Sequence, residues 1–142
     1  MLNALIDGIV SAIDAQYEDY PIYKEEVEQD LTEPCFLVRI IKPTIEPIIG
    51  DRFLRKNLVA VHYFPRKYGD YTEINDVFET LFSILEYITV DGVLTHGTKA
   101  DPRIEDGVGI FLINYDFFVY RTETGIETAG TLIMEGVEVN EE

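Results

Sequence analysis

Apolar residues recur at helical spacing in two stretches of the chain. The first stretch begins at the N-terminus and ends at Tyr20, because a residue before proline is disfavoured in a helix. The second follows Asp70, whose spacing to Glu73 is typical of a capping box with aspartate as the N-cap. Two amphipathic helices are therefore predicted, with apolar faces formed by Leu2, Leu5, Ile6, Ile9, Val10 and Ile13 and by Ile74, Val77, Phe78, Leu81, Leu85 and Ile88.

Alternating and densely apolar runs predict the strands. Residues 34–43 form a β-rich run between two prolines, and residues 52–67 are largely apolar at both odd and even positions. The second run therefore predicts a central strand, with helices or a partner covering both faces. Residues 108–120 give the strongest signal, with one face formed by Phe111, Ile113, Tyr115, Phe117 and Val119.

The remaining segments are predicted as edges and turns. Residues 21–29 alternate weakly and predict a short edge strand, and residues 131–139 predict a last strand. Proline and glycine in residues 44–51 indicate a turn or a flared connection. Residues 91–106 are rich in turn-forming residues and predict a long mobile hairpin.

The order of these elements is helix, several strands, helix, several strands. Because the strands are segregated and joined by short turns, we expect an α+β fold with a mostly antiparallel sheet and two amphipathic helices packed on it. A length of 142 residues predicts a single domain spanning 1–142, with an acidic C-terminal tail from about residue 135.

Charge narrows the possible functions. The net charge of −16 disfavours general binding to a phosphate backbone. Acidic residues gather in residues 18–33 and 123–142, whereas residues 39–67 hold seven basic residues against two acidic ones. Such opposite surfaces suit head-to-tail self-association, and ordinary solvent-exposed faces are the alternative. No 18-residue apolar stretch or basic leader is present, so we expect a soluble protein made in the cytoplasm.

Candidate catalytic residues are few. His62 lies in the middle of the central strand, where a carboxylate such as Asp116 would make an acid–base pair; packing within the sheet is the alternative. His96 stands alone, and Cys35 fits a buried apolar position. We expect no catalytic, cofactor-binding or metal-binding residues, and therefore no enzyme.

The basic residues of the central strand lie at its two ends. Arg52, Arg55 and Lys56 are separated from Arg66 and Lys67 by roughly 35 to 40 Å in an extended strand. They form two end clusters rather than one groove for a nucleic acid. Subunit contact is the functional interpretation that we prefer for both clusters.

The sequence also resembles a known family. The runs EPCFLVRIIKP, GDRFLRKNLVAVHYFP and GVGIFLINYDFFVYR, with a capped helix between the last two, are similar to the tail terminator (tail completion, head–tail joining) proteins of phages and prophages of Gram-positive bacteria, of the contractile-tail type. The resemblance covers nearly the whole chain and rests on sheet and turn signatures.

The resemblance implies a structural, non-enzymatic subunit without a cofactor. Such subunits assemble in the host cytoplasm into a ring, commonly a hexamer, that caps the head-proximal end of the tail tube. The ring stops tube growth and provides the surface for head attachment. The partners that the resemblance implies are other copies of the chain, the tail tube, sheath proteins and the head connector, and DNA would pass through the lumen without specific binding.

Charge and pattern suggest where the contacts lie. We hypothesise that basic ends meet an acidic edge of the next subunit, the residues being Arg52, Arg55, Arg66 and Lys67 against Glu25, Glu26, Glu28 and Asp30. A second hypothesis assigns the tube or connector contact to the 91–106 segment, through Asp91, Lys99, Asp101 and Arg103. Two alternatives stay open: a small ligand-binding domain or hydrolase using His62, and a dimeric interaction module.

Overall fold

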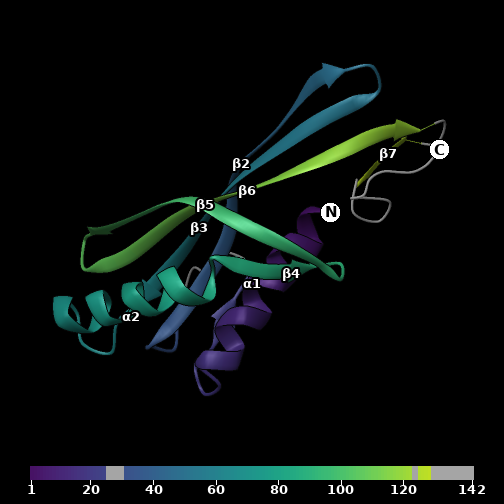
Figure 1. Ribbon diagram of the computed structural model, residues 1–142. Coiled ribbons are helices and arrows are strands. Elements are labelled where there is room, and N and C mark those ends of the chain that lie inside the picture. Colours follow the sequence, from purple (N-terminus) through teal and green to yellow (C-terminus); the bar gives the residue numbers. More distant parts are fainter. Residues whose placement is uncertain (25–30, 123–124, 129–142) are drawn as a thin grey trace.

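The computed structural model describes residues 1–24, 31–122 and 125–128 (Figure 1). Two helices, α1 (Leu2–Gln16) and α2 (Tyr71–Ile84), accompany seven strands. The strands are β1 (Ile22–Tyr23), β2 (Cys35–Ile49), β3 (Arg52–Phe64), β4 (Tyr87–Val90), β5 (Val93–Glu105), β6 (Val108–Thr122) and β7 (Gly125–Thr128). The predicted last strand at 131–139 lies outside the described residues.

The sheet has the order β1-β2-β3-β6-β5-β4, with β7 paired to β6. Only β1 and β2 run parallel to each other, whereas the other strand pairs are antiparallel. The predicted α+β class with a mostly antiparallel sheet is therefore confirmed. The long run at 52–64 is indeed central, because β3 lies between β2 and β6 along most of its length.

Both helices cover the same face of the sheet. Leu5, Ile9 and Ile13 of α1 are fully buried, as the predicted periodicity requires. They share one hydrophobic core with α2 and with alternate residues of three central strands, namely Phe36, Val38, Val59, Val61, Tyr63, Phe111, Ile113 and Tyr115. We call this helix-covered part the body; it occupies the lower part of Figure 1.

The opposite face of β3 has no helix on it among the described residues. Leu58, His62 and Phe64 point to this face and are only half-buried. Helices therefore cover one face, and cover of the other face by a partner stays a prediction. Both helices pack on the face formed by Val59, Val61 and Tyr63 of β3, because burying their apolar stripes against these side chains is favourable.

Beyond the helices, the β2–β3 hairpin projects as an arm, which we define as residues 40–56 (Figure 1). Of the turn or flared connection predicted over 44–51, only Gly50 and Asp51 form a turn, because β2 continues to Ile49 with irregular register near Ile41 and Ile48. The reversal occurs at Gly50, whose φ of 59° suits glycine. Proline is tolerated here because β2 is an edge strand over this stretch.

The outer edge of β2 carries no described strand beyond Leu37, since β1 pairs only with Phe36 and Leu37. Pro43 and Pro47 lie in this open stretch of β2. Proline fits an edge strand when its nitrogen, which has no hydrogen, faces away from the paired strand. The two prolines therefore remove N–H donors from the edge of the arm.

The prediction of a mobile hairpin over 91–106 is also wrong. Residues 93–105 form β5, which pairs with β4 at one end and with β6 along the rest. The pairing register with β6 shifts between Thr98 and Asp101, where Lys99 has a φ of 57°. The turn-forming residues therefore lie at an irregularity within a strand and do not end it. Past this point β5 is an edge strand, so it accommodates Pro102.

The second helix ends earlier than predicted. Asp70 is its N-cap, and the Asp70 carboxylate accepts a hydrogen bond of 3.1 Å from the backbone N–H of Glu73, which confirms the predicted cap. The helix stops at Ile84, and the buried Ile88 belongs to β4 instead. A bend at Leu85 and Glu86 follows the helix, and the backbone oxygen of Glu86 accepts a hydrogen bond of 2.7 Å from the backbone N–H of Gly97.

Candidate assembly surfaces

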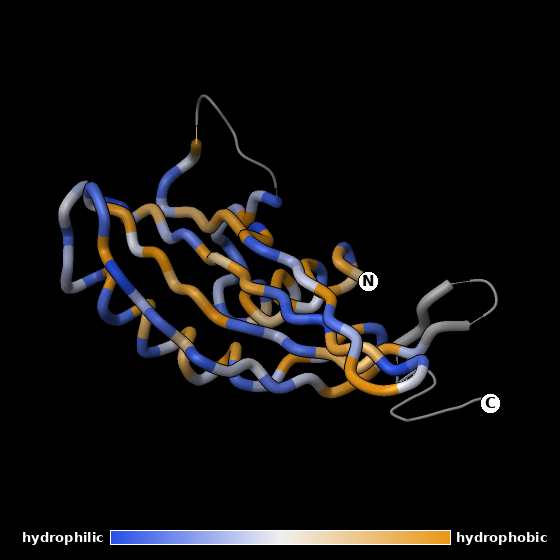
Figure 2. Tube along the Cα trace, turned by 90° about the horizontal axis from the view of Figure 1, so that it is seen from above, coloured by the Kyte–Doolittle hydropathy of each residue, from blue (hydrophilic) through white to orange (hydrophobic). Residues whose placement is uncertain are grey.

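The arm exposes large apolar side chains. Four isoleucines of β2 have exposed fractions between 43% and 74%: Ile41, Ile45, Ile48 and Ile49. Phe118 of β6, which lies beside the arm, is also exposed. In Figure 2 the arm carries hydrophobic positions on strands that no helix covers. Apolar side chains gathered in this way on an uncovered element are typical of a protein-binding surface.

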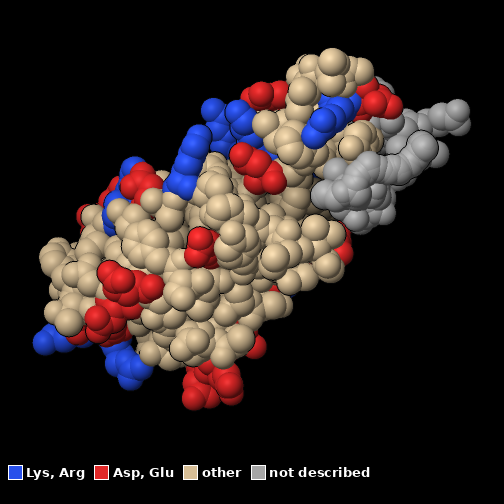
Figure 3. Space-filling model, viewed as in Figure 1, with Lys and Arg blue, Asp and Glu red and all other residues tan. Residues whose placement is uncertain are grey.

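The arm is also basic. It holds Lys42, Arg52, Arg55 and Lys56 against two acidic residues, Glu46 and Asp51, in a chain whose net charge is −16. The Arg52 guanidinium lies 4.4 Å from the centre of the Phe118 ring, and Lys56 makes an exposed ion pair with Glu46 at 3.4 Å. Figure 3 shows Lys and Arg side chains along this part of the molecule.

The predicted interface residues do not lie on one surface. Arg52 and Arg55 are half-buried in the arm, whereas Arg66 and Lys67 follow the other end of β3. Arg66 already has contacts within the chain, because its Nη2 donates to the Tyr20 hydroxyl at 3.0 Å. The predicted acidic edge, Glu25, Glu26, Glu28 and Asp30, lies outside the described residues.

The four residues of the predicted tube or connector contact are also spread out. Asp91 lies in the turn between β4 and β5, and Lys99 lies at the irregularity of β5. Asp101 and Arg103 pair with each other at 2.7 Å on the exposed side of β5. They are surface positions of an ordered strand and its turn, so the structure does not bring them together as one loop.

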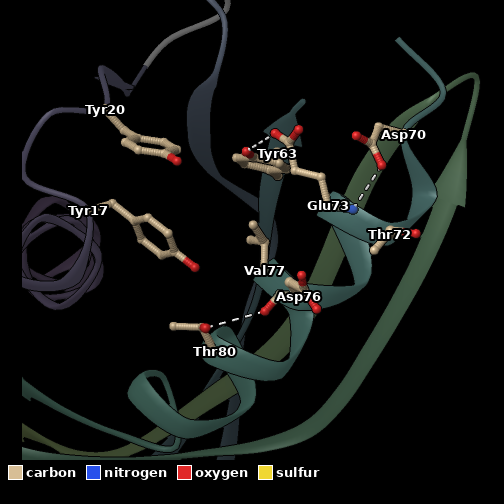
Figure 4. Close-up of a pocket in the computed structure, with 9 residues that line it drawn as sticks. All are labelled: Tyr17, Tyr20, Tyr63, Asp70, Thr72, Glu73, Asp76, Val77 and Thr80. Atoms are coloured by element: carbon tan, nitrogen blue, oxygen red, sulfur yellow. Dashed lines mark hydrogen bonds between the residues drawn. The ribbon is translucent and has the colours of Figure 1, made fainter. Parts of the chain in front are cut away.

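A pocket of about 470 Å³ opens between the end of α1 and the start of α2. Figure 4 shows the Tyr17 and Tyr20 rings on one side and side chains of α2 on the other. The lining residues are Tyr17, Tyr20, Tyr63, Asp70, Thr72, Glu73, Asp76, Val77 and Thr80. The pocket therefore combines aromatic rings with three carboxylates.

The aromatic rings of the pocket form a packed group. The Tyr17 and Tyr20 ring centres are 5.0 Å apart, and those of Tyr20 and Tyr63 are 6.5 Å apart. The fully buried Phe36 contacts all three rings from the core. Contacts between aromatic rings are stabilising, so the Tyr17, Tyr20 and Tyr63 rings are held in position by one another and by Phe36.

Hydrogen bonds hold two of the three carboxylates in place, since Asp70 is the N-cap of α2 and accepts from the backbone N–H of Glu73. Glu73 accepts from the Tyr63 hydroxyl and, at 2.8 Å, from the backbone N–H of Arg66. Burial, followed by this hydrogen bond, raises the pKa of Tyr63 well above its usual range. The Asp76 carboxylate is exposed at the pocket rim, and no residue of the described part of the chain forms an ion pair with it.

The candidate pair of His62 and Asp116 is not brought together in the described part of the chain. His62 accepts a hydrogen bond of 3.2 Å from Arg39 Nε, and its partners across the sheet are Leu37 and Ile110. Asp116 pairs with Lys56 instead, six positions farther along β6, which is about 20 Å away. The postulated pair of His62 and Asp116 is therefore wrong.

The other two candidate residues also have structural surroundings. His96 stacks on Tyr87, with ring centres 4.6 Å apart, and lies 3.8 Å from Glu86. Cys35 is buried, as predicted, and burial, followed by the charge of Glu33, raises its thiol pKa to about 11. In the described ranges no three His, Cys, Asp or Glu side chains gather as metal ligands do, and no helix has the length and apolarity to span a membrane.

Sequence reasoning missed the pocket. Its aromatic residues come from the end of α1, the segment after it and the end of β3, so no local motif joins them. The sequence holds a partial signal for the pocket. Tyr17 and Tyr20 are three positions apart before Pro21, and Tyr63 is on the same face of its strand as the core-facing Val59 and Val61.

The sequence matches a known protein family. A profile described as phage tail terminator protein matches residues 4–127, which includes α2, nearly all of α1 and nearly all of the described strands. A search of the curated proteins finds no match to the chain.

Proposed function

The chain belongs to the phage tail terminator protein family, and on that premise we propose that it forms a ring that caps the head-proximal end of the tail tube. The family is a structural one of the virion tail, so a role in tail completion follows. In our proposal the ring, a hexamer, stops tube growth and presents the surface to which the filled head attaches. It assembles in the host cytoplasm from copies of one domain, residues 1–142, whose acidic tail from about 135 lies outside the described part.

One observation supports self-association most strongly, namely the uncovered arm. A strand hairpin with four exposed isoleucines has no cover from its own chain among the described residues. Burial of apolar surface of this kind is favourable by about 25 cal/mol per Å². A subunit that keeps such an arm is therefore suited to place it against a neighbour.

Charge sets a condition on the ring. A hexamer would carry six times the net charge of −16, and this repulsion disfavours assembly unless basic and acidic surfaces meet. The arm provides the basic surface through Arg52 and Arg55. We propose Arg66 and Lys67 as a second basic contact, with Glu25, Glu26, Glu28 and Asp30 among the acidic partners.

The remaining partners follow from the position in the tail. We propose that the ring contacts the tail tube, sheath proteins and a head connector, with Asp91, Lys99, Asp101 and Arg103 as contact positions on β5 and its turn. The acidic character of the chain suits a lumen through which DNA slides without specific binding. A contractile tail and a Gram-positive host, as phage or prophage, are part of the proposal because the sequence resemblance implies them.

The test is electron microscopy of particles made by a phage or lysogen that lacks this gene. Abnormally long tubes without heads are expected, because nothing would end tube growth or join the head. Complementation with the wild-type gene is the control and should restore tails of uniform length. Tails of normal length on filled heads in the deletion strain would overturn the proposal.

A further inference from the structure

We propose that the pocket between α1 and α2 receives the tip of the arm, Ile49 with Arg52, from a neighbouring copy of the chain. This inference rests on the proposed ring, and it assigns the two surfaces that meet in that ring. The pocket is the one lined by Tyr17, Tyr20 and Tyr63 together with carboxylates of α2 (Figure 4).

The pocket has the chemistry to bind an apolar group beside a cation. Its rings offer apolar surface, and aromatic faces attract guanidinium groups. The nearby Arg66 already shows this preference, because its guanidinium lies 5.9 Å from the centre of the Tyr20 ring. Asp76 adds a rim carboxylate that no described residue pairs with, so it is available to a cation from outside the chain.

The tip of the arm has the complementary features. Ile49 is 74% exposed, the highest exposed fraction among the apolar side chains of the arm. Arg52 is its direct partner across the hairpin, so an apolar side chain and a cation stand side by side. The Arg52 guanidinium is held over Phe118, which reduces the conformational entropy that binding would cost.

The positions of the two surfaces exclude contact within one chain. The tip lies at the start of β3, and Tyr63 of the pocket lies at its end. At about 3.3 Å per residue, the strand separates them by roughly 35 Å. A contact between two different surfaces at opposite ends is heterologous, and heterologous contacts generate rings when the rotation closes.

Side-chain docking is favoured over strand addition at this arm. A neighbouring strand would need the outer N–H groups of β2, and Pro43 and Pro47 lack theirs. Side chains at the tip have no such restriction. The contact is therefore expected to depend on Ile49 and Arg52 rather than on backbone pairing.

The first experiment is a charge swap in the full-length chain, with the oligomer followed by sedimentation velocity over a range of concentrations. Arg52→Glu and Asp76→Arg should each weaken assembly by about tenfold or more, because attraction becomes repulsion in a partly desolvated site. The double variant Arg52→Glu/Asp76→Arg should recover most of the wild-type affinity. Glu79→Arg is the matched control, exposed on α2 and outside both surfaces, and should assemble like wild type.

A second experiment reports proximity directly. Ile49→Cys protein is mixed with Thr80→Cys protein under mild oxidation, and a disulfide-linked dimer is expected because Thr80 lines the pocket. Glu79→Cys, on the same helix but outside the pocket, is the control partner and should not cross-link. The native Cys35 is buried and gives no background.

The outcomes separate this inference from the proposed function. If the wild-type chain assembles but neither the charge reversals nor the cross-link has an effect, the pocket contact is overturned while the ring stands. Loss of assembly in both single variants without recovery in the double variant also overturns the pairing of Arg52 with Asp76. If the chain stays monomeric and does not cross-link, the proposed contact is overturned. The terminator role is tested separately, by the tail lengths in the deletion strain.

Discussion

The two ends of strand β3 lie in different surroundings. At its C-terminal end, Val59, Val61 and Tyr63 are buried beneath both helices. At its N-terminal end the same strand belongs to the arm, where its partner strand exposes isoleucines to solvent. One strand thus connects a region stabilised by its own core to a region without such a core.

This difference separates folding from assembly. The body holds the fully buried side chains of both helices and of three central strands, so it provides the hydrophobic stabilisation of the fold. The arm is held mainly by its strand ladder and keeps its apolar side chains exposed. Substitutions in the body should therefore change stability, and substitutions in the arm should change association.

The largest expected effect is a cavity in the body. Leu81→Ala removes a fully buried side chain of α2 and should lower the free energy of unfolding by about 4 kcal/mol. The comparison variant in the arm is Ile45→Thr, which keeps a β-branched residue at a position that is 46% exposed. It should change the free energy of unfolding by less than about 0.5 kcal/mol. Urea unfolding of dilute protein measures both. Equal losses would show that the arm is packed like the body.

The next largest effect comes from two glycines with different roles. A Cβ at Gly97 would lie 2.6 Å from Ile113 Cδ1 and 2.7 Å from the Leu85 backbone oxygen, so Gly97→Ala should cost about 3 kcal/mol. At Gly50 in the arm nothing lies within 4 Å, and only the φ of 59° opposes a side chain. Gly50→Ala should therefore cost about 1 kcal/mol. Thermal unfolding of both variants measures the loss of stability. A larger loss in Gly50→Ala than in Gly97→Ala would contradict the packed surroundings of Gly97 and the open surroundings of Gly50.

The smallest effect concerns alkaline pH and again belongs to the body. Burial raises the pKa of Tyr115, whose hydroxyl donates a 2.6 Å hydrogen bond to the backbone oxygen of Leu85. The folded-state pKa of Tyr115 lies above the unfolded value near 10. The stabilisation that comes from this raised pKa is therefore complete below about pH 10 and is lost as the pH rises further. Each such tyrosine should lower the free energy of unfolding by about 1.4 kcal/mol per pH unit there.

Unfolding measured between pH 9 and pH 11 tests this dependence. Tyr115→Phe should remove the part of the pH dependence of the free energy of unfolding above pH 10 that corresponds to one titrating proton. It should also lower the free energy of unfolding by about 1 to 2 kcal/mol at neutral pH, because the backbone oxygen of Leu85 loses its hydrogen bond. Ile45→Thr, in the arm, serves as the control and should keep the wild-type slope. An unchanged slope in Tyr115→Phe would mean that this hydroxyl does not titrate differently on unfolding.

The parts of the fold that follow from local periodicity were predictable. The buried face of α1, the cap at Asp70 and the central position of β3 depend on spacing within one segment. The arm and β5 were not predictable in this way, because Pro47, Gly97 and Pro102 read as turn residues when the sheet edge around them is unknown. Tertiary position decides whether such residues end a strand or lie within it.

The candidate site was predictable to a smaller extent. The basic character of the arm follows from composition, so Arg52 and Arg55 were identified without a structure. The pocket depends on the meeting of Tyr17, Tyr63 and Asp76 from three elements, which only the tertiary fold brings together. A single sequence contains no signal for such a long-range arrangement.

Pro43 and Pro47 have a consequence for control of polymer growth. If the chain ends tube growth as we propose, an open strand edge on it would let further copies add to one another by strand pairing. The missing N–H groups on the outer edge of β2 interrupt any such ladder at two points. The same arm that is suited to bind one neighbour is thereby prevented from recruiting an endless series of them.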